Sequence, residues 1–254
     1  GQNFLLDPVA LGRIVEAADL SAGDSVVEVG AGVGNLTRLL AAEAGTVVAV
    51  ELDDSLVEIL REQVAGLTNV RVLHGDILQI RDFGFVDLAY KVVGNLPYYI
   101  TSAVLRHFLE GHPRPTLLVV TVQREVAERI VAQPGDMSLL AVSVQYYGQP
   151  RILTRIPAGS FYPSPQIDSA VVRIDVDAEP QVGLDEKVGE RAFFRVARAG
   201  FAQRRKTLRN SLSGGLGLDP TAVEDRLREA GVDPRRRAET LSLQEWAAVA
   251  RSLS

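Results

Sequence analysis

The stretch SVVEVGAGVGNL, residues 25–36, decides the fold of this chain. Residues 25–30 form a β-branched apolar run with the length of a buried strand, and a helical pattern follows from Asn35 to Ala44. The glycines between the two let the backbone turn and approach a ligand closely. The stretch therefore predicts a strand, a ligand-binding loop and a helix, which together form the first unit of an α/β sheet.

The alternation of strands and helices continues along the first two thirds of the chain. Further strands, with helices between them, are predicted at 46–52, 69–76, 85–95 and 116–122. Asp53 or Asp54 is expected to cap the helix that runs to about Ala65. This order indicates βαβ units, a mostly parallel sheet covered on both faces, and a ligand site at the carboxyl ends of its strands.

The remaining segments suggest an added sheet edge and a second domain. The apolar runs 138–148 and 169–176 are expected to form a hairpin-like edge of the sheet. After a linker with Pro and Gly, the pattern becomes wholly helical, with helices predicted at 186–199, 203–212, 220–230 and 243–253. We therefore expect a Rossmann-like α/β catalytic domain over residues 1–179 and a small all-helical domain over residues 180–254.

The composition excludes several classes of protein. The chain has 254 residues, enough for one sizeable core and a small accessory domain, and it has no cysteine. A disulfide framework, Cys-ligated zinc and thiol catalysis are therefore excluded. The three histidines have no metal-ligand spacing, so no catalytic metal is expected. No apolar run approaches the roughly 20 residues that span a bilayer, and no signal pattern is present, so we expect a cytoplasmic protein without a membrane partner.

The charge is unevenly distributed. The net charge of −5 argues at first against a nucleic-acid partner. However, residues 181–254 carry 14 Lys and Arg against 10 Asp and Glu, whereas residues 1–180 carry 13 against 22. The basic residues concentrate between Arg191 and Arg209. This cluster indicates either a solvated helix face or an RNA contact.

Ligand-type residues follow successive predicted strands. A dinucleotide fingerprint that starts at Gly30 and Gly32 would need a third glycine where this chain has Asn35, and the G-x-G-x-G spacing instead resembles that of methyltransferases using S-adenosyl-L-methionine (SAM). Glu51 ends the second strand, where a carboxylate can accept both hydroxyls of a ribose. Asp76 ends the third, within reach of an adenine amino group. An acidic rim fits SAM better than it fits a pyrophosphate.

The fourth strand brings the segment GNLPYYIT, residues 94–101, to the same edge. An adenine N6 amine is a poor nucleophile, so methyl transfer to it needs acceptors for its N–H groups and a platform for the ring. Asn95 offers its side-chain oxygen and Leu96 its carbonyl, Pro97 restricts the backbone, and Tyr98 offers a stacking face. The alternative is that Asn95 caps the next helix and Tyr98 belongs to the core.

Taken together, the motifs resemble one family, the ribosomal RNA adenine N6-dimethyltransferases, and most closely its bacterial small-subunit members. The resemblance covers nearly the whole chain, and the order and spacing of its motifs make it specific. The motifs are GQNFL at the N-terminus, EVGAGVGNLT, VELD, GDIL, GNLPYYIT, FYPSPQIDSAVVRI at 161–174 and FAQRRKTLRNSL at 201–212.

The resemblance implies a set of site residues. SAM would be bound by Asn3, Leu5, Gly30, Gly32, Glu51, Asp76 and Asn95. The target amine would meet Asn95, Leu96, Pro97 and Tyr98, with Phe161 as a second aromatic clamp on the flipped base. No role follows for Tyr99, because many family members have Asn at that position.

The resemblance also implies a substrate and a partner. The family's substrate is a pair of adjacent adenines in a hairpin loop near the 3′ end of small-subunit (16S) rRNA, which implies an enzyme that acts on an immature ribosomal subunit during ribosome biogenesis. A monomer is expected, although the sequence does not reveal the oligomeric state. RNA phosphates would be contacted by Arg204, Arg205, Lys206 and Arg209, unless Arg205 or Arg209 pairs with carboxylates of the first domain.

Three alternatives stay open. One is a resistance-type methyltransferase that modifies one adenine of large-subunit rRNA, and another is a methyltransferase for a protein glutamine amide, which Leu96 and the helical domain disfavour. The third is a non-catalytic ribosome-assembly or nucleic-acid-binding factor on the same fold, against which Glu51, Asp76 and Asn95 argue.

Overall fold

A computed structural model describes residues 3–85, 89–97, 99–183 and 189–253. The chain divides into two compact units. The sheet unit comprises Gly1–Glu128 and Gln149–Ala178, and the helical unit comprises Arg129–Gly148 and Glu179–Ser254. The expected catalytic and RNA-recognition roles of residues 1–179 and 180–254 remain predictions.

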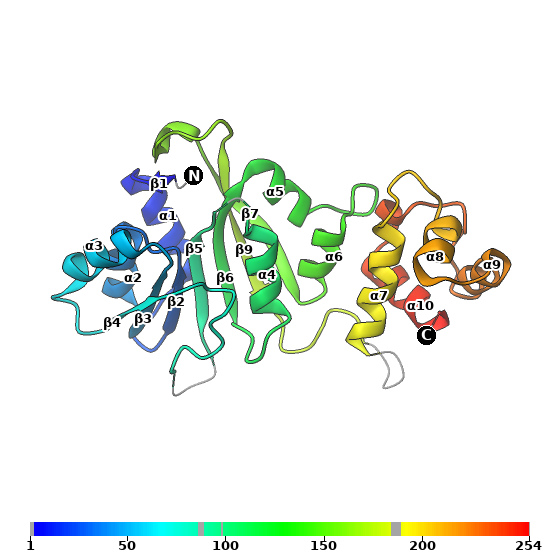
Figure 1. Ribbon diagram of the computed structural model, residues 1–254, viewed down its shortest axis with the longest axis horizontal. Helices are drawn as coiled ribbons and strands as arrows, with labels where there is room; N and C mark the ends of the chain where they lie inside the picture. The colour runs from blue at the N-terminus through cyan, green and yellow to red at the C-terminus, as the bar shows by residue number, and fades with distance from the viewer. Residues whose placement is uncertain (1–2, 86–88, 98, 184–188, 254) are drawn as a thin grey trace. The chain divides into compact units, whose positions relative to one another are not determined.

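The sheet unit is built on a seven-stranded sheet with the order β4-β3-β2-β5-β6-β9-β7 (Figure 1). The first five of these strands are parallel, and β9 is antiparallel to β6. The strands are β2 (Ser25–Val29), β3 (Thr46–Glu51), β4 (Val70–His74), β5 (Lys91–Asn95), β6 (Leu117–Gln123), β7 (Gly148–Ile156) and β9 (Ser169–Val176). The predicted α/β fold with a mostly parallel sheet is confirmed.

Helices follow most of the parallel strands and cover the sheet, but the described residues between β4 and β5 form no helix, so the helix predicted between these two strands is not found there. The helices are α1 (Pro8–Ala18), α2 (Asn35–Glu43), α3 (Asp54–Val64) and α4 (Thr101–Leu109), followed by α5 (Arg124–Ile130). The central strands read as continuous apolar runs because both of their faces are buried, as in LLVVTV of β6. The cap of α3 is Asp53, whose carboxylate accepts from Ser55 N and Leu56 N.

The predicted strand at 138–148 is wrong. Residues Leu139–Gln145 form helix α6, capped by the Ser138 hydroxyl, which accepts from Ala141 N. The edge strand is β7, where exposed and less exposed residues alternate as expected for a strand with one covered face. A short helix that is buried on nearly all sides has no apolar periodicity, so its sequence resembles that of a buried strand.

The helical unit combines α6 with four later helices. These are α7 (Glu190–Phe201), α8 (Leu208–Leu216), α9 (Pro220–Glu229) and α10 (Leu243–Ser252), with the 3₁₀ turn η2 (Ala238–Thr240) before the last. Trp246 of α10 is fully buried against α7, where a Cβ on Gly200 would come within 2.3 Å of its ring. Tyr146 and Phe193 stack in the same core, with ring centroids 4.8 Å apart.

The predicted helices of this unit agree with α9 and α10 within a residue or two. The helices α7 and α8 begin later than predicted, and residues 184–188, where the first was expected to start, lie outside the described part of the chain. Across the described residues, no helix is long and apolar enough to cross a membrane.

A small two-stranded ribbon joins the N-terminal segment to residues far along the chain. Strand β1 (Phe4–Leu5) pairs antiparallel with β8 (Phe161–Tyr162), which follows the 3₁₀ turn η1 (Ala158–Ser160). The Ser160 hydroxyl donates to the Asp7 carboxylate at 2.9 Å, and Leu6 N donates to Ser160 O at 3.0 Å. These bonds hold the N-terminal segment beside the carboxyl ends of the central strands.

Candidate methyl-transfer site

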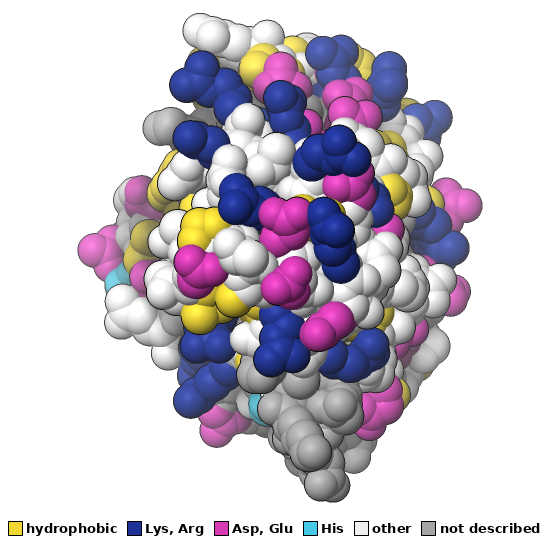
Figure 2. All heavy atoms as spheres, turned by 90° about the vertical axis from the view of Figure 1, so that its right-hand side faces the viewer, with side chains coloured by type: hydrophobic (Ala, Val, Ile, Leu, Met, Phe, Trp, Pro, Cys, Tyr) yellow, Lys and Arg dark blue, Asp and Glu magenta, His cyan; other side chains and the backbone are white. Residues whose placement is uncertain are grey.

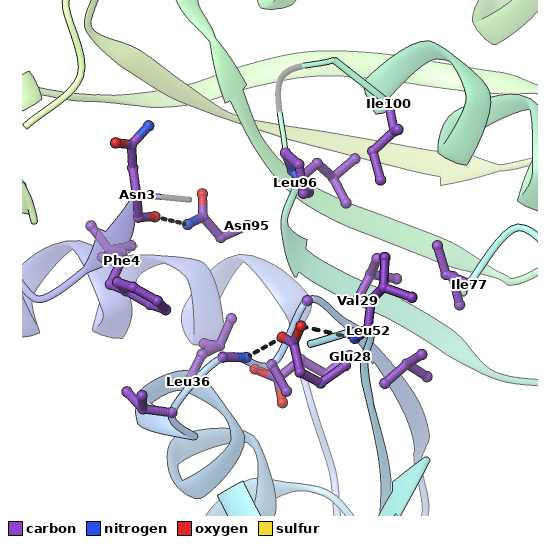
Figure 3. A pocket seen from close by; sticks show the side chains of 18 of the residues that line it. Asn3, Phe4, Glu28, Val29, Leu36, Leu52, Ile77, Asn95, Leu96 and Ile100 are labelled. Atoms are coloured by element: carbon purple, nitrogen blue, oxygen red, sulfur yellow. Dashed lines mark hydrogen bonds between the residues drawn. The ribbon is translucent and has the colours of Figure 1, made fainter. Parts of the chain in front are cut away.

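The main cavity of the sheet unit opens where β2, β3 and β5 end, as expected for a parallel sheet (Figure 3). It is lined by Asn3, Phe4, Leu5, Leu11, Glu28 to Val33, Asn35, Leu36, Val50 to Leu52, Gly75 to Ile77, Asn95 to Pro97, Tyr99 and Ile100. The structure thus brings together the residues that the sequence proposed for the cofactor, from Asn3 to Asn95.

The glycine loop between β2 and α2 is held in a left-handed conformation. Gly30, Gly32 and Gly34 have φ angles of 72°, 57° and 85°, which disfavour any residue with a Cβ. At Gly32 a Cβ would also come within 3.3 Å of the Phe4 ring. The loop backbone therefore lies close against the cavity, where a side chain would occupy the space of a ligand.

The side chain of Glu51 fixes this glycine loop through a hydrogen bond from its backbone. Its buried carboxylate accepts from Gly32 N at 2.8 Å on Oε2, and from Leu52 N at 2.8 Å and Asp53 N at 3.0 Å on Oε1. A carboxylate has about four acceptor positions, so one is left for a hydroxyl of a bound ribose. The sequence predicted the ligand contact and did not predict the bracing of the glycine loop.

Asp76 follows β4 and is half-buried at the cavity. Its Oδ1 accepts from Leu78 N at 2.9 Å, which fixes the turn after the strand. Its Oδ2 accepts at 3.3 Å from the side chain of Gln79, which is exposed and long enough to move away. Asp76 can therefore accept from an amino group in the cavity, as the predicted adenine contact requires.

The side-chain amide of Asn95 is oriented by the N-terminal segment. Its Nδ2 donates to the Asn3 carbonyl at 3.0 Å (Figure 3). A carbonyl oxygen can only accept, so this bond assigns the amide nitrogen to Asn3 and leaves Oδ1 as an acceptor. The amide is thus set to receive an N–H donor, which is the role that the sequence proposed for it.

The backbone after β5 supplies a second acceptor. Leu96 N donates to Thr121 O at 3.1 Å, and Pro97 O accepts from Ile100 N at 3.1 Å. Among the described residues none donates to the Leu96 carbonyl. Helix α4 is preceded by Ile100 as its N-cap residue, so the alternative in which Asn95 caps the next helix is wrong. Tyr98 lies outside the described residues.

Glu28 is a functional candidate that the sequence analysis missed. It lies inside β2, is 1% exposed and lines the cavity, and its Oε2 has no hydrogen-bond partner among the described residues. Burial raises the pKa of Glu28 to about 8; the Thr37 hydroxyl opposes this shift and the Glu51 carboxylate adds to it. The signal was an acidic residue within an apolar strand, which is uncommon in a core.

This raised pKa predicts a pH-dependent stability. The unfolded chain ionises Glu28 near pH 4.5 while the folded protein keeps the proton until about pH 8, so its contribution is full below pH 4.5 and is lost as the pH rises to 8. Between pH 5 and 8 the wild type should lose about 3 kcal/mol of unfolding free energy through this group. Urea unfolding at several pH values should show a flatter profile for Glu28→Gln.

The matched control is Glu43→Gln, which replaces an exposed carboxylate on α2 and should keep the wild-type pH profile. Identical profiles for wild type and Glu28→Gln would show that Glu28 ionises in the folded protein as it does in the unfolded chain.

The candidate residues in and beside the β1–β8 ribbon differ in whether they line the cavity. Asn3 and Leu5 line the cavity, in agreement with their predicted closeness to the cofactor. Phe161 is 4% exposed in the core cluster that includes Leu5 and Leu11, and it does not line the cavity. Its assignment as a clamp on the target base remains a prediction.

The predicted RNA-binding residues lie in the helical unit. Arg204, Arg205 and Lys206 are exposed in the turn between α7 and α8, and none has a carboxylate partner among the described residues. Arg209 Nε lies 2.9 Å from Glu224 Oε2 of α9, so it pairs within its own unit. Figure 2 turns the right-hand side of Figure 1 toward the viewer, and on that surface many Lys and Arg side chains are interspersed with Asp and Glu.

No metal centre is found in the part of the chain that the structure describes, where no three His, Cys, Asp or Glu side chains could share an ion. That the enzyme works without a metal remains a prediction.

The sequence profile of the family described as ribosomal RNA adenine dimethylase matches residues 1–254. The chain belongs to this family. It is 51% identical over 248 residues to ribosomal RNA small subunit methyltransferase A of Dehalococcoides mccartyi strain CBDB1, which covers 97% of this chain and 84% of the relative. The protein of the same name from Moorella thermoacetica is 44% identical, over 100% of this chain and 91% of its own.

Two solved structures agree with the fold of this adenine dimethylase. The crystal structure of the 23S rRNA methyltransferase ErmE superposes with a TM-score of 0.78 at 29% identity, over 99% of both chains. A dimethyladenosine transferase from Plasmodium falciparum superposes with a TM-score of 0.81 at 22% identity, over 97% of this chain and 95% of its own. The helical unit is thus part of the shared architecture.

As a ribosomal RNA adenine dimethylase, the chain transfers methyl groups from SAM. The cavity fits this cofactor. The glycines keep side chains out of the loop that borders the cavity, Glu51 retains acceptor capacity, and Glu28 presents an oxygen without a partner among the described residues. These groups match the amino, hydroxyl and amine donors of a nucleoside with a cationic tail.

Proposed function

We propose that this chain dimethylates the N6 amines of two adjacent adenines in a hairpin loop near the 3′ end of small-subunit (16S) rRNA, within an immature ribosomal subunit. The observation that carries the proposal is the orientation of the Asn95 amide, whose oxygen is kept as an acceptor next to the Leu96 carbonyl, to which no described residue donates. The names of the curated relatives, small subunit methyltransferases, support the choice of rRNA.

The two acceptors suit the chemistry of an aromatic amine. The N6 nitrogen carries two N–H groups, and hydrogen bonds to Asn95 Oδ1 and Leu96 O direct its lone pair out of conjugation with the ring. When bound, SAM supplies an electrophilic methyl group on a sulfonium, so the amine can attack before it loses its proton. Alignment of the reacting atoms then provides most of the rate enhancement, and no strong base is needed.

Transfer of a second methyl group is compatible with this arrangement. After the first transfer and loss of one proton, the amine keeps one N–H and needs one acceptor. The site offers two, so the monomethylated base can rebind with its remaining N–H on either oxygen. The buried Leu96 and Leu36 give the cavity apolar walls that exclude water from the reacting atoms.

The basic turn predicts salt-dependent RNA binding. Arg204, Arg205 and Lys206 have no carboxylate partner in the part of the chain that the structure describes, so they are available to pair with phosphates. Replacing all three by Gln should weaken RNA binding at 0.1 M salt and reduce the slope of log K against log salt by about 0.7 to 0.9 per lost contact. Filter binding across a salt series measures both.

The control is Arg226→Gln, which removes an arginine of the same unit that already pairs with Glu229 at 3.1 Å. It should leave the slope close to that of the wild type. An unchanged slope in the triple variant would remove this turn from the RNA contacts.

A second candidate function is methylation of one adenine in large-subunit rRNA, which the 29% identity to ErmE over 99% of both chains favours. Primer extension on both rRNAs after incubation with SAM distinguishes the two. We expect blocks at two adjacent adenines of small-subunit rRNA. A single block on large-subunit rRNA would replace the proposal by this alternative.

The monomeric state and the cytoplasmic location remain predictions.

A further inference from the structure

The described aromatic side chains are unevenly exposed. Tyr99 is 81% and Tyr162 is 70% exposed, and every other described Phe, Tyr or Trp is buried or half-buried. Both belong to the sheet unit. An exposed ring gains nothing from the core, so a binding role is worth testing for both, beginning with Tyr99, which lines the cavity.

Tyr99 is part of the cavity wall. It follows Leu96 and Pro97 and precedes α4. Neither its ring nor its hydroxyl has a partner among the described residues. The ring is therefore available to a ligand that extends out of the cavity, whose lining also includes the amine acceptors Asn95 and Leu96.

Tyr162 lies on the ribbon at the N-terminal segment. In the β1–β8 pair, Leu5 is opposite Phe161 and Phe4 is opposite Tyr162. Residues directly opposite each other share a face of the ribbon, and successive residues alternate. Leu5 and Phe161 are both buried in the core, so Tyr162 shares the other face with Phe4, which lines the cavity (Figure 3).

Tyr99 thus lines the cavity itself, whereas Tyr162 lies opposite Phe4, which lines the cavity from the ribbon. Figure 3 shows Phe4, the neighbour of Tyr162, and Ile100, the neighbour of Tyr99, on different sides of the site. A target adenine that enters the site leaves its stack, and the bases before and after it lose a stacking partner. Aromatic rings at the rim can replace that partner, and every base has a face that fits.

We propose that Tyr99 and Tyr162 stack on the unpaired RNA bases that flank the target adenine, and so select substrates in which the adenine lies in a single-stranded loop. This inference rests on the proposed function, because it needs an RNA substrate. It assigns both rings to RNA affinity and neither to cofactor binding or to the chemical step.

The test compares alanine and phenylalanine variants at both positions. KM and kcat are measured with immature small subunits as substrate, and the Kd of SAM is measured by calorimetry. Tyr99→Ala and Tyr162→Ala should each raise the KM for RNA roughly tenfold, since stacking on a base has about that effect. The phenylalanine variants keep the ring and should stay close to the wild type. SAM affinity should not change in any variant.

Ile59→Ala is the matched control, because it shortens an exposed apolar side chain on α3 that does not line the cavity. Its KM should equal that of the wild type. A wild-type KM in both alanine variants would overturn the inference, as would a fall in kcat alone or a change in SAM affinity. If the wild type methylates no RNA, the proposed function is wrong and the inference is wrong with it. If the wild type is active but the alanine variants behave like it, only the inference is wrong.

Discussion

Replacing Asn95 by alanine is expected to lower kcat for methyl transfer by a factor of about 100 or more, while RNA affinity stays within about twofold. The variant removes the amide oxygen that Asn3 holds toward the cavity, and with it one of the two acceptors for the N6 amine. An interaction that orients the amine for attack acts mainly in the transition state, so its loss lowers kcat more than it raises KM. Single-turnover kinetics with labelled SAM would measure the effect.

A matched control separates this role from a general loss of stability. Asn69 also donates its amide to backbone carbonyls, those of Ala41 and Ala44, both at 2.9 Å, and it does not line the cavity. Asn69→Ala should destabilise the fold by about 1 kcal/mol and leave kcat unchanged. Wild-type turnover in Asn95→Ala would contradict the assignment of Asn95 as the amine acceptor.

The second large effect is expected at Glu51. Glu51→Ala leaves Gly32 N, Leu52 N and Asp53 N without their acceptor and removes the group predicted to hold the ribose. Hydrogen bonds to a charged group contribute about 1.5 to 3 kcal/mol each, so loss of the ribose contacts and of the loop conformation should weaken SAM binding by a factor of about 100 or more. Calorimetric titration with SAM measures this change.

A thermal assay shows whether the loss concerns the cofactor. SAM at 100 times its Kd should stabilise the wild type by about 2.7 kcal/mol, and this increment should fall to about 0.4 kcal/mol or less in Glu51→Ala at the same concentration. Glu51→Gln is a useful second variant, because it keeps the length of the side chain. Its amide can place an NH2 donor opposite the Gly32 N–H, where the wild-type carboxylate has an acceptor. Calorimetry that gives Glu51→Ala the wild-type affinity would contradict the placement of the cofactor.

The sequence was sufficient for the fold and for the prediction that several candidate residues share one cavity, because its signals were local. Asp53 caps α3, the β2–loop–α2 unit has the predicted order, and Glu51, Asp76 and Asn95 end successive strands at one edge. A parallel sheet brings its strand ends together whatever the details of packing, so these side chains could be predicted to share a site.

Other features depended on tertiary contacts. Residues 139–145 are apolar enough to be buried as a strand or as a helix, and packing within the helical unit decides for the helix. The pairing of Phe4 with Tyr162 joins two short strands far apart along the chain, and no periodicity reveals it. Its consequence, the burial of Phe161 and the exposure of Tyr162, was therefore also hidden. Glu28 could be seen in the sequence as an acidic residue within a strand, but only the structure shows that it lines the cavity and is therefore a functional candidate.

The most direct test of the account is incubation of the protein with methyl-labelled SAM and immature small ribosomal subunits, followed by nucleoside analysis of the rRNA. We expect the label in N6,N6-dimethyladenosine, with two of these nucleosides formed in each subunit. In Asn95→Ala the label should be lost. Absence of label from N6,N6-dimethyladenosine in the wild type, whether no transfer occurs or another nucleoside is labelled, would contradict the account.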